Sequence, residues 1–176
     1  MSVLKEPKPA KVLTALLFNP SLDQKNVFEI LTAHFGDMDF ISESIRFDYS
    51  AYYEPEMGSD LIRRFVTYRD LKEQDGLVSL KLLSVEIENM FKNNGNRRLN
   101  IDPGLITLER LVLATGKNYT HRIYLGKGVF GDLTLIYKKG SYTPLPWTYP
   151  DYREPVVIGW LNKIRQKYNQ QLRGIG

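Results

Sequence analysis

The chain has 176 residues, a net charge of +4 and no cysteine. This length accommodates one well-buried core and excludes two domains of ordinary size, while the lack of cysteine excludes disulfides, a thiolate nucleophile and cysteine-ligated zinc or iron–sulfur sites. The 24 Lys and Arg residues are interleaved with 20 Asp and Glu residues, which indicates a solvated surface rather than the clustered basic face of a nucleic-acid-binding protein.

The N-terminal segment predicts neither secretion nor membrane insertion. Its sequence, MSVLKEPKPAK, lacks the apolar h-region of a signal peptide, and no apolar run in the chain approaches the roughly 20 residues that span a bilayer. We therefore expect a cytoplasmic protein without a membrane segment. Pro7 and Pro9 disrupt regular structure, so residues 1–10 are predicted to form a flexible arm ahead of a single domain over residues 11–176.

The first part of the chain predicts the element order β-α-β-β-α-β. Residues 11–19, KVLTALLFN, form a nearly continuous apolar run, which is typical of a central strand covered on both faces. The periodicities that follow predict an amphipathic helix between Ser21 and Gly36, strands over 40–49 and 61–68, a helix between Gly76 and Asn93, and a strand over 97–101. This is the order of a ferredoxin-like split βαβ unit.

The next stretch contains a predicted turn and an ambiguous element. Asp102-Pro103-Gly104 has the residue chemistry of a turn. Residues 107–115 have the length and hydrophobicity of either a short helix or a buried strand. We favour the helix, because Thr107 could cap it and Gly116 could end it.

Residues 126–131 spell GxGxxG, the pattern of a dinucleotide-binding loop. In that fold the third glycine opens a helix, whereas residues 132–137, DLTLIY, alternate as a strand does. The motif is therefore interpreted as the turn of an antiparallel hairpin between strands over 121–125 and 129–138. Glu154-Pro155 begins a C-terminal helix. We predict an α+β fold with a ferredoxin-like split βαβ core, an added antiparallel hairpin, and the C-terminal helix packed on the sheet.

Four blocks of sequence carry a family resemblance. They are FDYSAYYEPEMG (47–58), NIDPGLITLERLVLATGK (100–117), HRIYLGKGVFGDLTLIY (121–137) and PWTYPDY (146–152). Together they resemble the signature blocks of a prokaryotic family designated domain of unknown function 4416, in the order that this family shows and over nearly the whole chain. The resemblance implies a stand-alone, single-domain prokaryotic protein. It implies no activity, cofactor or catalytic residue, because the family has none established.

Titratable and aromatic side chains concentrate in loops rather than in the periodic core. His121 is the candidate general acid or base, since imidazole titrates near neutrality, and Asp102 is its candidate carboxylate partner. A strand-end histidine bonded to backbone and an Asx turn are the structural alternatives. The candidate ligand-binding residues are anion contacts and pocket walls, namely Arg122, Lys127, Tyr53, Glu54, Trp147, Tyr149 and Asp151. The carboxylates have no spacing that is diagnostic of a metal site, so no metal ligand is predicted and no cofactor is identified.

These residues lead to one functional hypothesis and two alternatives. The leading hypothesis is a cytosolic enzyme or binding protein for a small phosphorylated or nucleotide-like ligand. The first alternative is an RNA-binding module, because ferredoxin-like sheets can stack bases on exposed aromatic side chains; the missing RNP1 pattern disfavours it. The second is a protein–protein interaction module without catalysis, which a large exposed apolar patch would favour.

Overall fold

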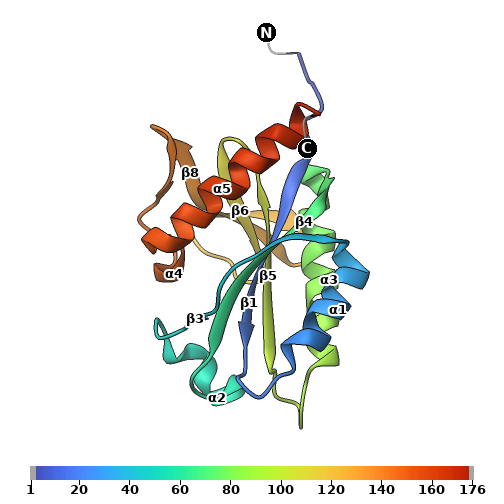
Figure 1. Ribbon diagram of the computed structural model, residues 1–176, viewed down its shortest axis with the longest axis vertical. Coiled ribbons are helices and arrows are strands. Elements are labelled where there is room, and N and C mark those ends of the chain that lie inside the picture. Colours follow the sequence, from blue (N-terminus) through green and yellow to red (C-terminus); the bar gives the residue numbers. More distant parts are fainter. Residues whose placement is uncertain (1–2, 175–176) are drawn as a thin grey trace.

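One antiparallel sheet organises the protein, whose structure is a computed structural model describing residues 3–174. The strands in these residues are β1 (Ala10–Phe18), β2 (Met38–Ile41), β3 (Ile45–Arg46), β4 (Ile62–Lys72), β5 (Leu99–Ile106), β6 (Arg110–Thr115), β7 (Arg122–Gly126), β8 (Val129–Lys138) and β9 (Ser141–Pro144). They lie in the order β2-β4-β1-β5-β6-β8-β7, with β3 beside β4 and β9 beside β8 (Figure 1). The fold is therefore mixed α and β, as predicted.

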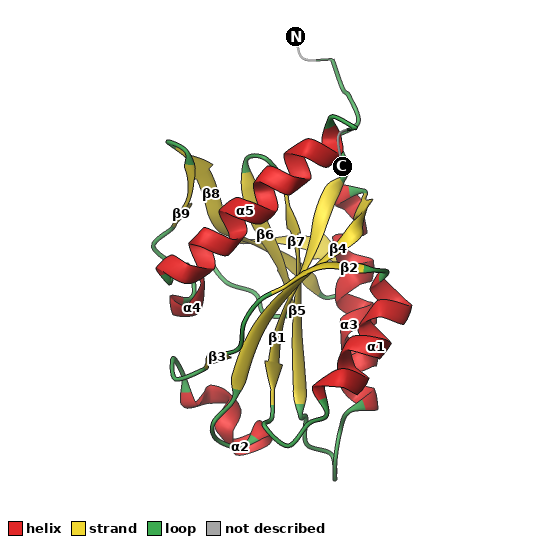
Figure 2. Cartoon of the chain, viewed as in Figure 1, coloured by secondary structure: helices red, strands yellow, loops and turns green. Residues whose placement is uncertain are grey.

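Helices cover both faces of the sheet (Figure 2). They are α1 (Gln24–Phe35), α2 (Glu54–Met57), α3 (Leu77–Met90), α4 (Pro150–Arg153) and α5 (Pro155–Leu172), together with short 3₁₀ turns at Ala51–Tyr53 and Gln74–Gly76. Side chains of α1 and α3 share one core cluster with the sheet, and side chains of α5 share a second cluster on the opposite face. The C-terminal helix packs on the sheet, as the sequence predicted.

Strand β1 lies at the centre of both cores. All nine of its residues are buried, and it pairs with β4 on one side and β5 on the other. Val12 and Leu16 contact the cluster of α1 and α3, whereas Leu13 and Ala15 contact that of α5. The prediction of a central strand covered on both faces is confirmed.

The predicted turn at Asp102-Pro103-Gly104 is wrong, because these residues continue β5 through to Ile106. Pro103 stands opposite Thr14 of β1, while the pairing of β5 with β6 begins only at Gly104. Proline is tolerated at strand positions that have a partner on one side only. These three residue types are typical of turns, but pairing with β1 holds their backbone in an extended conformation.

The favoured helix over residues 107–115 is also wrong. Residues 110–115 form β6, which pairs with β5 and with β8. Leu111 and Leu113 are buried in the cluster of α5, and Val112 packs against the opposite cluster. The length of this segment suits a helix or a strand equally. The alternating burial of its side chains and its pairing with two neighbouring strands make it a strand.

The remaining predictions need smaller changes. The predicted strand over 40–49 is split into β2 and β3, and the hydroxyl of Ser42 between them accepts a hydrogen bond from the backbone N–H of Phe65 at 2.9 Å. The hairpin of β7 and β8 is confirmed, and both of its loop residues, Lys127 and Gly128, have positive φ. Residues 3–9 contain no helix or strand, and residues 1 and 2 of the predicted arm lie outside the described residues. Between residues 3 and 174, no helix is long and apolar enough to cross a membrane.

Strands β5 and β6 are paired over a short stretch and then diverge. They pair only over Gly104–Ile106 of β5, so the first half of β5 has β1 on one side and no strand on the other. Side chains of α3 replace the missing strand. Glu88 accepts a hydrogen bond from the backbone N–H of Ile101 at 2.7 Å, and Lys81 donates one to its carbonyl oxygen at 3.1 Å. This arrangement satisfies the backbone without closing the edge with another strand.

The contact between the two strands depends on a glycine. A Cβ atom at position 104 would lie 2.7 Å from Cδ2 of Leu113 and 2.9 Å from the carbonyl oxygen of Val112. Gly104→Ala is therefore expected to destabilise the protein by about 1–3 kcal/mol through overpacking, measured as the free energy of unfolding in urea. Gly159→Ala is the matched control, because a Cβ atom there meets no other atom within 4 Å and alanine stabilises a helix interior by about 0.5–1 kcal/mol. Equal effects of the two substitutions would contradict this account.

Candidate functional site

A cavity of about 600 Å³ lies where β5 and β6 part. The loop between β3 and β4, the helix α3 and the segment that leads into α4 complete its walls. Its lining combines six aromatic rings (Phe47, Tyr49, Tyr52, Tyr53, Tyr149 and Tyr152), four cations (Arg63, Lys81, Arg97 and Lys117) and four acids (Glu88, Asp102, Asp132 and Asp151). We call it the Arg63 pocket.

Arg63 is the most deeply buried cation of this pocket. It lies on β4 opposite Leu17 of β1 and is 4% exposed. Its Nε atom is 2.9 Å from Oδ2 of Asp151, and its Nη1 atom is 3.7 Å from Oδ2 of Asp102. The guanidinium also lies over the ring of Phe47, 5.0 Å from the centroid. Arg63 is therefore an ion-paired residue at the floor of a cavity.

The polar atoms at this floor lack hydrogen bonds. Among the described residues, Nε and Nη1 of Arg63, Oδ2 of Asp151 and the hydroxyl of Tyr152 are enclosed and have no hydrogen-bond partner. The Arg63–Asp151 contact is thus an ion pair whose alignment does not make a hydrogen bond. Unsatisfied buried polar groups cost about 1–3 kcal/mol each and are few in native proteins, so four at one place are a feature that needs an explanation.

Burial and charge act in opposite directions on these groups. Burial alone lowers the pKa of Arg63, but the neighbouring Asp151, Tyr152 and Asp102 outweigh it and the pKa is raised, so Arg63 stays charged. Burial raises the pKa of Asp151, and Arg63 opposes that rise. Burial also raises the pKa of Tyr152 well above its ordinary value. The floor therefore holds the charged Arg63 between Asp102 and Asp151, with Lys81 as a second cation 3.9 Å from Asp102.

A chain of polar contacts positions Asp102. Glu56 of α2 accepts from Nη2 of Arg97 at 2.6 Å, Arg97 donates to Oδ1 of Asn100 at 3.2 Å, and Asn100 donates to Oδ2 of Asp102 at 2.9 Å. The hydrogen bonds from Arg97 lower the pKa of Glu56. Asp102 stays 28% exposed at its side chain, so it faces the cavity while its second oxygen is held.

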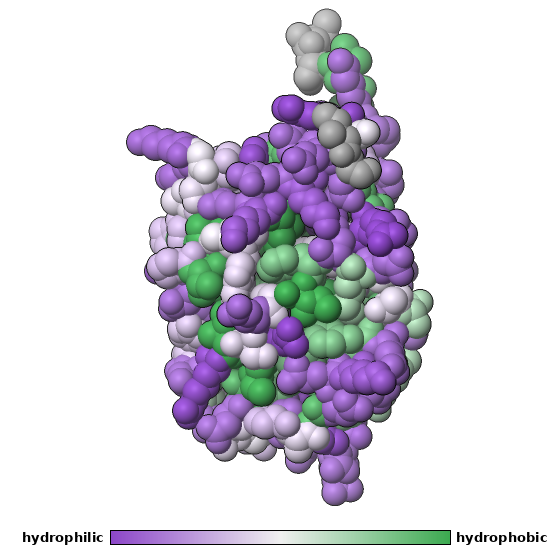
Figure 3. Space-filling model, viewed as in Figure 1, coloured by the Kyte–Doolittle hydropathy of each residue, from purple (hydrophilic) through white to green (hydrophobic). Residues whose placement is uncertain are grey.

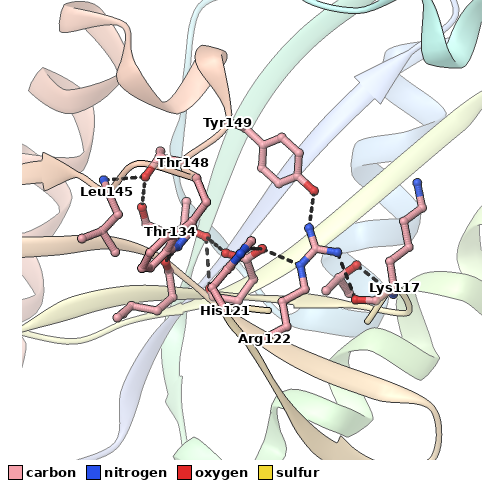
Figure 4. A network of polar contacts seen from close by, with 11 residues as sticks. Lys117, His121, Arg122, Thr134, Leu145, Thr148 and Tyr149 are labelled. Carbon is pink, nitrogen blue, oxygen red and sulfur yellow. Dashed lines mark hydrogen bonds and ion pairs between the residues drawn. The ribbon is translucent and has the colours of Figure 1, made fainter. Parts of the chain in front are cut away.

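The wall on the side of β7 and β8 is built around Arg122 (Figure 4). Its Nε atom donates to Asp132 at 2.8 Å, Nη2 donates to the hydroxyl of Tyr149 at 2.7 Å, and Nη1 donates to the carbonyl oxygen of Lys117 at 3.0 Å. Asp132 is 3% exposed. Arg122 therefore joins β7, β8, the turn after β6 and the segment before α4, and it fixes the positions of Asp132 and Tyr149.

His121 lies outside the Arg63 pocket. Its Nε2 atom is 3.2 Å from Oδ2 of Asp132, and its ring stacks on Trp147 with centroids 4.8 Å apart. Both rings line a second, more open depression together with Tyr119, Arg122, Pro146 and Tyr149. Tyr149 also lines the Arg63 pocket, so the two hollows share a wall. Asp132 thus lines the Arg63 pocket and also contacts His121 in the depression. His121 does not contact Asp102.

A family model described as domain of unknown function DUF4416 matches residues 8–168. The chain belongs to the DUF4416 family. No curated protein and no solved structure matches it. The resemblance seen in the sequence blocks is therefore confirmed over nearly the whole chain.

In this DUF4416 chain the residues predicted to form one site fall into three groups. Tyr53, Asp102, Tyr149 and Asp151 line the Arg63 pocket, and Arg122 is bonded to its wall. His121, Arg122 and Trp147 line the surface depression, to which Tyr149 also contributes. Lys127, in the β7–β8 turn, and Glu54, the exposed first residue of α2, line neither cavity. The predicted His121–Asp102 pair is not formed, because β5 and β7 are separated by β6 and β8 in the sheet.

Sequence reasoning missed several lining residues. They are Arg63, Lys81, Glu88, Arg97, Lys117 and Asp132. For Arg63 a signal exists in the sequence, because alternation along the predicted strand over 61–68 puts Arg63 and Arg64 on opposite faces of the sheet. Helical periodicity puts Glu88 on the outer face of its helix, yet it is buried, and burial raises its pKa. Across residues 3–174, no three His, Asp or Glu side chains are grouped so as to hold a metal ion.

Proposed function

We propose that the protein binds a small phosphorylated or nucleotide-like compound in the Arg63 pocket. The observation that carries this proposal is the charged guanidinium of Arg63, enclosed at the floor without a hydrogen bond to any described residue. Buried polar groups without a hydrogen-bond partner are few in native proteins and need an explanation, even where the charge itself is ion-paired. A bound ligand would supply an acceptor for Nη2, the one guanidinium nitrogen that is not among the enclosed atoms.

The size and lining of the pocket support a ligand of this class. Small-molecule sites have volumes of about 300–1,000 Å³ and combine apolar walls with a few convergent polar groups, and the Arg63 pocket has about 600 Å³. Tyr53 and Phe47 offer ring faces for stacking. Lys117, whose ammonium lies 3.9 Å from the ring centroid of Tyr52, offers a cation for a phosphate group.

Within this proposal the roles of the candidate residues change. Asp102 is a ligand contact, since it faces the cavity, and Arg122 positions Tyr149 and Asp132. His121 acts through its contact with Asp132 and not on the ligand itself. Asp102 is the most accessible of the four acids that line the pocket.

A thermal-shift screen over nucleotides, sugar phosphates and divalent ions tests this function. A ligand at 100 times its Kd stabilises a protein by about 2.7 kcal/mol, which corresponds to a rise in Tm of about 5–11 °C for this chain length. We expect Asp102→Ala to abolish the shift and His121→Ala to keep it, because only Asp102 lines the pocket. A screen in which no compound raises Tm would contradict the proposal.

A protein-interaction module is the second candidate function. It is supported by the edge strand β7, where Ile123, Tyr124 and Leu125 are 72%, 60% and 43% exposed. Figure 3 also shows a hydrophobic area at the centre of one face, with smaller ones beside and below it. The RNA-binding alternative has less support, because α5 covers one face of the sheet and α1 and α3 cover the other.

We further propose that β1, α1, β2, β4, α3 and β5 form a ferredoxin-like split βαβ unit. The strand order β2-β4-β1-β5, the antiparallel pairings and the position of α1 and α3 on one face support this assignment. A cytoplasmic location in a prokaryote remains part of the proposal, with the cysteine-free composition as its support.

A further inference from the structure

The floor and the rim of the Arg63 pocket differ in how their charges are paired. At the floor, Arg63 lies 3.7 and 2.9 Å from Asp102 and Asp151, and Lys81 lies 3.9 Å from Asp102, so two cations and two acids balance when both acids are ionised. At the rim, Lys117 stands over Tyr52 with no carboxylate within ion-pair distance among the described residues. A phosphate group is therefore attracted more strongly to the unpaired cation at the rim than to the paired charges of the floor.

The floor needs a partner that both donates and accepts hydrogen bonds. Of the Arg63 nitrogens, Nε and Nη1 are enclosed, which leaves Nη2 as the donor that reaches the cavity. Beside it, the Asp102 carboxylate accepts a hydrogen bond from Asn100 at Oδ2, and its Oδ1 atom lies 3.9 Å from the Lys81 ammonium, beyond hydrogen-bond distance. An apolar ring would leave both groups unpaired, and an anion would satisfy Arg63 only.

Vicinal hydroxyl groups meet both requirements at once. One hydroxyl donates to the carboxylate of Asp102 while its neighbour accepts from the guanidinium, and each hydroxyl has a donor and two acceptor sites. A carboxylate that accepts from a ribose hydroxyl is an established mode of nucleotide recognition in other folds. The tyrosine rings of the wall cover the less polar face of a sugar ring.

We propose that the floor of the Arg63 pocket binds the vicinal diol of a sugar ring, with the phosphate of the same ligand at the rim beside Lys117. This inference rests on the proposed function and names its ligand class, a phosphorylated sugar. The ring belongs either to a free sugar phosphate or to the ribose of a nucleotide, since the diol chemistry is shared.

Matched pairs of probes that differ by one hydroxyl test this inference. Binding is measured by titration calorimetry with ribose 5-phosphate against 2-deoxyribose 5-phosphate, glucose 6-phosphate against 2-deoxyglucose 6-phosphate, and AMP against 2′-deoxy-AMP. We expect the hydroxylated member of at least one pair to bind at least 10-fold more tightly, because the site leaves buried polar groups unpaired with the other member. The pair that shows the difference tells a free sugar phosphate from a nucleotide.

Three variants separate the diol contact from the phosphate contact. Asp102→Asn is expected to remove the difference within the pair, whereas Lys117→Met is expected to weaken both members equally and keep their ratio. Asp48→Asn is the control, because this carboxylate is 66% exposed and pairs with Arg46 outside the pocket.

Equal binding of both members to the parent protein overturns the diol inference and leaves the proposed function standing. Absence of binding by every phosphorylated probe overturns the proposed function, and the diol inference falls with it.

Discussion

Replacing Lys11 with methionine is expected to lower the free energy of unfolding by about 3–5 kcal/mol, which is the cost of leaving one partner of a buried ion pair alone. Lys11 is 0% exposed, and its Nζ atom is 2.5 Å from Oδ2 of Asp39 and 2.6 Å from Oε1 of Gln171. The pair joins β1 and β2 to the end of α5. Burial lowers the pKa of Lys11, and the contacts with Asp39 oppose that fall. Urea denaturation or a fall in Tm of about 6–20 °C would record the loss.

Two controls make this prediction specific. Lys25→Met removes an exposed pair, in which Nζ lies 3.9 Å from Glu29 and the side chains are 85% and 66% exposed, and should change stability by less than about 0.5 kcal/mol. Lys11→Met combined with Asp39→Asn should recover part of the loss, because no buried charge is then left alone. A single variant as stable as the parent would mean that Lys167, 3.4 Å from Asp39, compensates fully, and the prediction would be wrong.

Most helices and strands could be predicted because their hydrophobic periodicity and turn residues are visible in the local sequence. The apolar run of residues 11–19 became β1, and the glycines at 126 and 128 became a hairpin turn. The failures occurred where a partner far away in the sequence decided the backbone. Strand β1 extends Asp102-Pro103-Gly104, and β5 and β8 turn residues 110–115 into a strand. Lys11 was included in a buried strand, but nothing local showed that Asp39 and Gln171 would neutralise and bond it.

The candidate site also combines features that are visible in the local sequence with features that only the folded sheet creates. Aromatic and acidic residues in loops pointed to Tyr53, Tyr149 and Asp151, all of which line the Arg63 pocket. The cavity itself arises because β6 leaves β5 after three paired residues, and no spacing in the sequence encodes that parting. Lys81 and Glu88 look like solvent-facing helix residues by periodicity. In the structure they hydrogen-bond to the backbone of Ile101, at a strand edge that has no neighbouring strand and exists only in the folded sheet.

Replacing Arg63 with methionine is expected to destabilise the ligand-free protein by about 3–5 kcal/mol near neutral pH and by much less in acid. Methionine fills the space, but Asp151, whose side chain is 4% exposed, loses its cation. Burial raises the Asp151 pKa and Arg63 opposes the rise, so removal of Arg63 places the folded pKa further above the ordinary value of about 3.9. The folded state then binds more protons than the unfolded state between these two values. Stability therefore falls as pH rises through this window and stays low above it, which urea denaturation at a series of pH values would measure.

Arg64 provides the matched comparison from the next position of the same strand. It faces the opposite side, lies over Phe28 at 5.1 Å and donates to the carbonyl oxygen of Ser42 and to Gln24, so Arg64→Met should cause a smaller loss that does not depend on pH. A pH-independent loss for Arg63→Met would contradict the assignment of Asp151 as its buried partner. The double replacement Arg63→Met with Asp151→Leu removes both charges, and apolar replacements of buried pairs are often as stable as the parent. If that variant is stable and no longer binds the phosphorylated probes, the pair is retained for ligand recognition, because stability would not require it.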